Sequence, residues 1–185
     1  MTTSKDFFQA WLNVVNEPNR LLTLKSNWFN NKEYTNEIIT KENSVIEEVG
    51  NILDFKIYER NYYSLDAIFY NELNKVPKIN SDTYWFKDIE IAFEHENTFN
   101  KDLYQEVAHL LITRCNMRVL VTYPNNNEES VLDYLHEIIS SCDIAKEISK
   151  KENFLIILGY YQDGNCKWKG QVYINTKEKW KPLNN

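Results

Sequence analysis

The spacing of hydrophobic positions changes several times along the chain, and each spacing predicts a different element. Apolar residues recur every three or four positions, as on one face of a helix, in four segments: 4–16, 34–49, 100–114 and 128–149. Alternating or continuous apolar runs, which are typical of strands, occupy six others: 52–58, 62–70, 84–94, 117–123, 154–161 and 167–174. This order predicts a mixed central sheet with helices on its faces, in an α/β or α+β fold.

Single residues mark the ends of several of these elements. Residues 34–49 are expected to form one helix or two short ones that end at Gly50, because glycine adopts the left-handed conformation that closes many helices. Asp163 and Gly164 predict a tight turn, so the last two strands are expected to form a C-terminal β-hairpin. The tail from Asn175 is expected to be peripheral.

Composition narrows the class of protein. With 185 residues, of which 43% are hydrophobic and 14% aromatic, the chain can bury the core of a single domain over 1–185, and intrinsic disorder is excluded. No apolar run approaches the length of a membrane span, and the first residues lack the apolar region of a secretory signal. The three Cys are widely separated and suggest neither a disulfide framework nor a zinc site. A cytoplasmic location is therefore expected.

Charge limits the partners. The chain has 21 Lys and Arg against 27 Asp and Glu, a net charge of −6. This excludes a generally basic coat for nucleic acid, although it leaves room for a local basic patch.

The densest group of titratable residues lies at the end of the third predicted strand. Alternation places Glu90, Glu94 and Glu96 on one face of this strand and His95 on the other. Carboxylates that share a face repel one another, and either a divalent cation or protonation of one of them relieves the repulsion. Oxygen ligands with no Cys nearby favour Mg²⁺, Mn²⁺ or Ca²⁺ over Zn²⁺.

A further carboxylate interrupts the preceding strand. Asp66 stands in an otherwise apolar run, where an unpartnered charge is costly. If the second and third strands are neighbours, Asp66 and Glu94 meet at one edge of the sheet.

The order of helix, three strands, helix and fourth strand, with Asp66 on the second strand and Glu94-His95-Glu96 on the third, resembles the core of the PD-(D/E)XK nuclease superfamily. The resemblance covers about residues 44–123. It implies a restriction-endonuclease-like fold with extra N-terminal helices, and a Mg²⁺-dependent (or Mn²⁺-dependent) endonuclease, active or degenerate. Such an enzyme would hydrolyse phosphodiester bonds in DNA or, in some members, RNA.

The same resemblance implies roles for individual residues. Asp66 and Glu94 would bind the metal together with the backbone carbonyl of His95, and Glu48 would be an additional acid. Glu96 stands where the superfamily usually has Lys, and would complete the catalytic set with Asp66 and Glu94 by ligating a second ion or orienting the attacking water. Candidate substrate contacts near the motif are Lys87, Lys101, Arg114, Gln105 and His109.

Two other interpretations stay open. In the first, Glu94 and Glu96 are surface carboxylates at a strand end, and Asp66 pairs with Lys87 or Arg118. In the second, the chain is a non-catalytic acidic module, such as an immunity or accessory protein, that binds a basic protein. The acidic charge and the missing Lys favour this second reading. The expected partner is thus DNA or a basic protein, a homodimer is compatible with either, and no membrane partner is expected.

Overall fold

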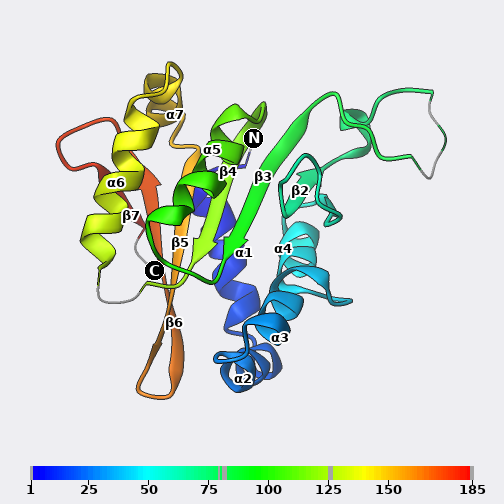
Figure 1. The fold of residues 1–185 in the computed structure, drawn as a ribbon. Helices are drawn as coiled ribbons and strands as arrows, with labels where there is room; N and C mark the ends of the chain where they lie inside the picture. The colour runs from blue at the N-terminus through cyan, green and yellow to red at the C-terminus, as the bar shows by residue number, and fades with distance from the viewer. Residues whose placement is uncertain (1, 79, 81–82, 125–126, 184–185) are drawn as a thin grey trace.

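A seven-stranded mixed sheet forms the middle layer of the structure, and helices cover both of its faces (Figure 1). The structure is a computed structural model that describes residues 2–78, 80, 83–124 and 127–183, without the side chain of Lys101. The strands are β1 Lys56–Tyr58, β2 Ala67–Tyr70, β3 Ile89–Glu96, β4 Cys115–Thr122, β5 Phe154–Gln162, β6 Asn165–Tyr173 and β7 Trp180–Leu183. They lie side by side in chain order.

The direction of the strands changes twice across the sheet. β1, β2 and β3 are antiparallel, β3, β4 and β5 are parallel, and β5, β6 and β7 are antiparallel again. The parallel strands need crossover connections, which the helices after β3 and β4 supply. The α/β class with a mixed sheet flanked by helices is therefore confirmed.

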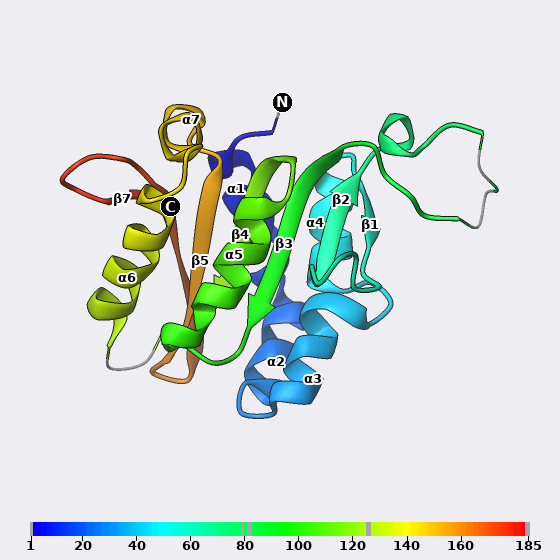
Figure 2. The same cartoon turned by 45° about the horizontal axis from the view of Figure 1, so that its top comes forward.

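The helices form two layers. The helices that precede β1 in the sequence cover one face. They are α1 Ser4–Val15, α2 Pro18–Asn27, α3 Asn31–Thr35, a π-helical turn Asn36–Thr40 and α4 Val45–Ile52. Those on the opposite face are α5 Tyr104–Ile112, α6 Glu128–Ser140 and α7 Ala145–Lys151. In Figure 2, α5 lies in front of β4 and α1 lies behind it. No helix in the described ranges is both long and apolar enough to cross a membrane.

Each layer encloses its own hydrophobic core, because successive side chains of a strand point to opposite faces. On β3, Phe93 packs with the N-terminal helices, where its ring stacks on Trp11 with the centroids 6.4 Å apart. Its neighbour Ala92 packs in the core under α5. It follows that Glu94 faces α5, whereas His95 faces α1 to α4.

The segment over 34–49, predicted as one helix or two short ones, is broken, and its expected end is wrong. It divides into α3, the π-helical turn and α4, and Gly50 lies inside α4. A Cβ atom at Gly50 would lie 2.7 Å from the Ile57 side chain. Glycine is therefore needed here to let β1 pass close to the helix, not to end it.

The helix predicted over 128–149 is also two helices, α6 and α7. At about 100° per residue, a continuous helix would place Ile148 opposite Ile139. Both residues are buried in the same core, so the chain has to turn between them.

Three predicted strands are shorter than expected. Residues 52–55 belong to the end of α4 and a turn in which Asp54 has a φ of 59°. The Tyr62–Leu65 segment forms a tight turn before β2, and β3 begins only at Ile89.

Two further elements were not predicted from the sequence. α2 follows Pro18, a residue that suits the first helical position. β7 pairs with β6 in antiparallel fashion, so the tail completes the sheet and is not peripheral.

Candidate functional site

Asp66 and Glu94 are in contact where β2 begins beside β3. The β2–β3 pairing sets Ala67 opposite Phe93, which brings the preceding Asp66 opposite Glu94. The backbone N–H of Asp66 donates to Glu94 Oε2 at 3.2 Å, and the backbone N–H of His95 donates to Asp66 Oδ2 at 2.8 Å. The two strands are neighbours, so the two acids meet as their positions in the sequence predict.

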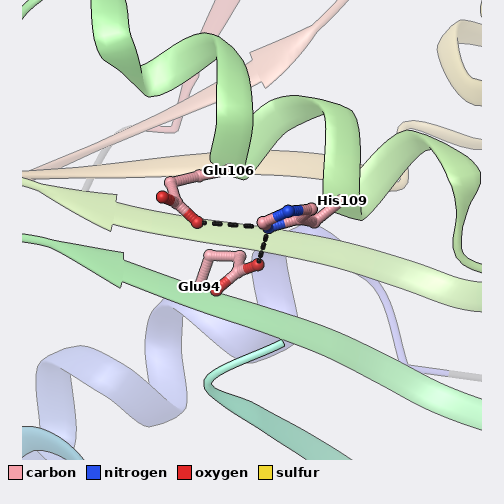
Figure 3. Close-up of side chains that lie close together, drawn as sticks. All are labelled: Glu94, Glu106 and His109. Atoms are coloured by element: carbon pink, nitrogen blue, oxygen red, sulfur yellow. Dashed lines mark hydrogen bonds and ion pairs between the residues drawn. The ribbon is translucent and has the colours of Figure 1, made fainter. Parts of the chain in front are cut away.

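Helix α5 adds two side chains to this pair (Figure 3). His109 Nδ1 lies 3.2 Å from Glu94 Oε1 and 3.5 Å from Glu106 Oε2. Glu106 and His109 are three residues apart and therefore share one face of the helix. One ligand atom from each of Glu94, Glu106 and His109 lies within 4.8 Å of the other two. Together with Asp66 they form the group that we call the acidic cluster.

The acidic cluster is buried at its base and open at its rim. The side chain of Glu94 is 1% exposed, whereas the side chains of Glu106 and His109 are 21% and 33% exposed. Burial, and then the charges of Asp66 and Glu106, raise the pKa of Glu94 to about 10. Burial also raises the pKa of Asp66 and of Glu106. Burial therefore favours the protonated form of Glu94 when no cation is bound.

Glu96 stands at the edge of this group. It is half-buried, and its Oε1 accepts a hydrogen bond of 2.7 Å from the backbone N–H of Thr98. Its charge raises the pKa of both Asp66 and Glu106. Glu96 thus adds negative potential to the cluster without a hydrogen bond to its members among the described residues.

The side chain of His95 belongs to the other face of the sheet, as alternation predicts. Its Nε2 lies 2.7 Å from the hydroxyl of Tyr123, and burial lowers the pKa of the imidazole to about 3. His95 therefore acts on the cluster only through its main chain, where its N–H holds Asp66. Its backbone carbonyl as a metal ligand remains a prediction.

Glu48 does not join the cluster. It lies on α4, which packs on the opposite face of the sheet, and its Oε1 accepts a hydrogen bond of 3.0 Å from Arg20. Its predicted role as an additional metal ligand is therefore wrong, because the sheet separates it from Glu94.

Of the predicted substrate contacts that the structure describes, His109 lies among the carboxylates and the others do not. Lys87 is exposed and precedes β3, seven residues before Glu94, which is about 20 Å along an extended strand. Gln105 is exposed on α5 and donates to the Tyr104 hydroxyl at 3.1 Å. Arg114 is 92% exposed and lies 3.9 Å from Asp88. The side chain of Lys101 lies outside the described part of the chain.

The interpretation of Glu94 and Glu96 as surface carboxylates fails for Glu94, and the pairing expected for Asp66 is wrong. Glu94 is buried, and Asp66 has no pairing with Lys87 or Arg118. Arg118 instead donates to the backbone carbonyls of Leu110 and Thr113, at 2.9 and 3.0 Å.

Glu106 is the site residue that the sequence analysis missed. The available signal was the Glu-x-x-His spacing of Glu106 and His109, on a helix that directly follows an acidic strand. His109, predicted as a substrate contact, points toward the cluster, where it is half-buried.

The donor set suits a hard or borderline divalent cation. Two carboxyl groups and one imidazole nitrogen converge, with Asp66 beside Glu94, and a bound cation would favour the ionised form of Glu94 that burial disfavours. The Thr122 hydroxyl, on the strand position paired with Glu96, is buried and has no partner among the described residues. Comparison of the chain with known protein families, curated proteins and solved structures found no match, so these residues are the basis for inferring its function.

Proposed function

We propose that the chain is a divalent-metal-dependent nuclease that hydrolyses phosphodiester bonds. The observation that carries the proposal is the burial of Glu94 against Asp66 and His109. Burying a carboxyl group between a second acid and an imidazole destabilises the folded protein, so a purely structural role does not explain it. The buried position of Glu94 has a function if its carboxyl group exchanges its proton for a cation.

The order and direction of the elements support the same proposal. α4, β1, β2, β3, α5 and β4 follow one another, with β1 to β3 antiparallel and β4 parallel to β3. Asp66 precedes β2, and Glu94 stands opposite it on β3. This is the arrangement that the resemblance to the PD-(D/E)XK superfamily implies for residues 44–123, so a restriction-endonuclease-like fold is part of the proposal.

In the proposed reaction, Asp66, Glu94, Glu106 and His109 would hold Mg²⁺ or Mn²⁺. The ion would supply Lewis acidity and a bound water of lowered pKa. Glu96, at the rim of the cluster, accepts the proton of the attacking water. The water oxygen bonds to phosphorus as the bond from phosphorus to the leaving oxygen breaks. The leaving oxygen takes a proton from solvent water, which yields one phosphate end and one hydroxyl end.

Metal binding and cleavage test this proposal together. Mn²⁺ binding is measured by electron paramagnetic resonance, and plasmid, single-stranded DNA and RNA are incubated with Mg²⁺ or Mn²⁺. Glu94→Gln should lose both metal binding and cleavage, because it keeps the shape of the side chain and removes its charge. The matched control Glu129→Gln changes an exposed carboxylate on α6 and should retain both. Wild-type protein that binds neither ion contradicts the proposal.

One observation favours a second candidate, the non-catalytic acidic module. None of the described hydrogen bonds and ion pairs of Asp66, Glu94, Glu96 and Glu106 involves Lys or Arg. The rim is therefore available to a basic protein surface. This candidate predicts salt-sensitive binding of a basic protein that weakens in Glu96→Gln and needs no divalent ion.

A further inference from the structure

An exposed aromatic pair stands at the turn that precedes β2. The side chains of Tyr63 and Trp85 are exposed large hydrophobic groups, at 70% and 52% of their residue surface. Their ring centroids are 6.1 Å apart, with the planes inclined at 58°. Tyr63 comes from the turn before β2 and Trp85 from the segment that leads into β3. We call these two residues the aromatic pair.

The turn itself gives no structural reason for a tyrosine. Tyr62 and Leu65 exchange two backbone hydrogen bonds of 3.1 Å, which leaves Tyr63 and Ser64 as the two central residues of a hairpin turn. Their φ angles are 51° and 71°, in the left-handed region that favours Gly and Asn. Tyr63 therefore occupies an unfavourable backbone conformation and also exposes its ring.

The rings are attached to segments that the structure ties together. The Tyr62 hydroxyl accepts a hydrogen bond of 3.2 Å from the backbone N–H of Phe86, which follows Trp85. The backbone carbonyl of Trp85 accepts one of 2.9 Å from Val76. These bonds hold the pair in place before any ligand binds, which reduces the entropic cost of stacking.

The base of the turn that carries Tyr63 lies on the same side of the sheet as the acidic cluster. Tyr62 and Leu65, which form the base of the turn, pack in the core beneath α5, the helix that carries Glu106 and His109. Tyr63 precedes Asp66 by three residues, so their Cα atoms are at most about 11 Å apart.

Two cations flank the aromatic pair in the sequence. Arg60 and Lys87 are exposed, and their side chains have no hydrogen bond or ion pair with any described residue. Two acids of the same region are already paired, Glu72 with Lys56 at 2.6 Å and Asp88 with Arg114 at 3.9 Å. This pairing offsets the charge of these two acids, whereas Glu59, next to Arg60, is exposed.

We propose that Tyr63 and Trp85 stack on an unpaired base of a nucleic-acid strand, with Arg60 and Lys87 beside its phosphates. Exposed rings bind bases of any sequence through their π faces, and a base is accessible to both rings only when it is unpaired. The substrate of the acidic cluster is then single-stranded or locally unpaired nucleic acid. Binding of the strand stands independently of the cluster, whereas its cleavage rests on the proposed function.

Fluorescence anisotropy of a labelled oligothymidylate tests the aromatic pair in EDTA, where no metal is bound. The double variant Tyr63→Ala/Trp85→Ala should weaken binding about tenfold or more. Tyr63→Phe should retain most of the affinity, because it keeps the ring. Phe29→Ala removes another exposed ring, at 82% exposure, and should bind like wild type. An oligomer of abasic sites should bind weakly, and to the same extent, in wild type and the double variant.

The outcomes separate this inference from the proposed nuclease activity. Wild-type protein that binds no oligothymidylate, or a folded double variant with unchanged affinity, overturns the stacking proposal. Equal affinity for the single strand and for a duplex of the same length also overturns it. Ring-dependent binding in a protein that binds no Mn²⁺ supports the stacking proposal while the metal site fails. Mn²⁺ binding with ring-independent affinity gives the reverse result.

Discussion

Glu94 Oε1 lies 3.2 Å from His109 Nδ1, and this contact joins the end of β3 to the middle of α5. Glu94 is fully enclosed there, with Asp66 on its other side. Because β3 and α5 enclose Glu94 at this contact, the protonation of its carboxyl group depends on whether a cation is bound between them. This dependence can be measured.

The stability of the protein should depend on the proton of Glu94. Its pKa rises from 4.5 to about 10 on folding, so between these values the folded chain keeps a proton that the unfolded chain releases. The free energy of unfolding should therefore fall as pH rises, by at most about 1.4 kcal/mol per pH unit from this group. In Glu94→Gln that slope should disappear, and the variant should be about 2 kcal/mol more stable than wild type at pH 8. Urea unfolding from pH 5 to pH 9 measures both effects.

Glu129→Gln is the control for this experiment, because its carboxylate is exposed and should leave the slope unchanged. A Glu94→Gln variant that keeps the wild-type slope would show that Glu94 is ionised at neutral pH in the folded protein.

Binding of Mn²⁺ should release a proton. Glu94 has to ionise to bind a cation, so the affinity should rise about tenfold per pH unit below its folded pKa. Isothermal titration calorimetry at one pH, in buffers with different ionisation enthalpies, counts the protons released. Binding that is independent of both pH and buffer would place the ion elsewhere.

His95 should make the protein sensitive to acid. Burial lowers the pKa of its imidazole from 6.5 to about 3. Between these pH values the unfolded chain binds a proton at His95 and the folded chain does not. The free energy of unfolding should fall as pH decreases below 6.5, by at most about 1.4 kcal/mol per unit. His95→Phe should remove this part of the acid dependence. Unfolding curves from pH 4 to pH 7 test the prediction, and identical slopes in both proteins refute it.

Gly159→Ala should destabilise the core on the side of the N-terminal helices. A Cβ atom there would lie 2.7 Å from the Tyr123 ring and 2.8 Å from Trp168, so these rings would have to move, at a cost of about 2 kcal/mol. Gly164→Ala is the comparison. A Cβ atom at Gly164 would lie in open space, and only the φ of 72° is unfavourable for alanine. The substitution should therefore destabilise the protein by about 1 kcal/mol. Thermal unfolding of both variants should rank Gly159→Ala as the less stable.

The pairing of Asp66 with Glu94 could be predicted because alternation and strand order are both visible in the sequence. The order of the elements, and the separation of Glu94 from His95 on opposite faces, follow from the same period of two. Contacts that depend on helix packing were not accessible in this way. Glu48 fits a motif by its position, yet the face on which α4 packs takes it to Arg20.

Element ends were predicted less well where tertiary packing overrides local preference. The Gly50 position is typical of a helix end, but close approach of Ile57 is what requires glycine there. In the same way, the apolar pattern through residues 128–149 is continuous, and only the common core of Ile139 and Ile148 shows that the helix must break.

The order of the strands across the sheet has a consequence for synthesis. Because β1 to β7 lie side by side in chain order, each strand that leaves the ribosome can pair with the strand synthesised just before it. The residues of the acidic cluster lie between positions 66 and 109, in the first two thirds of the chain. All of them, and β4 beneath α5, are made before β5 to β7, so the nascent chain can assemble the cluster while its last third is still being translated.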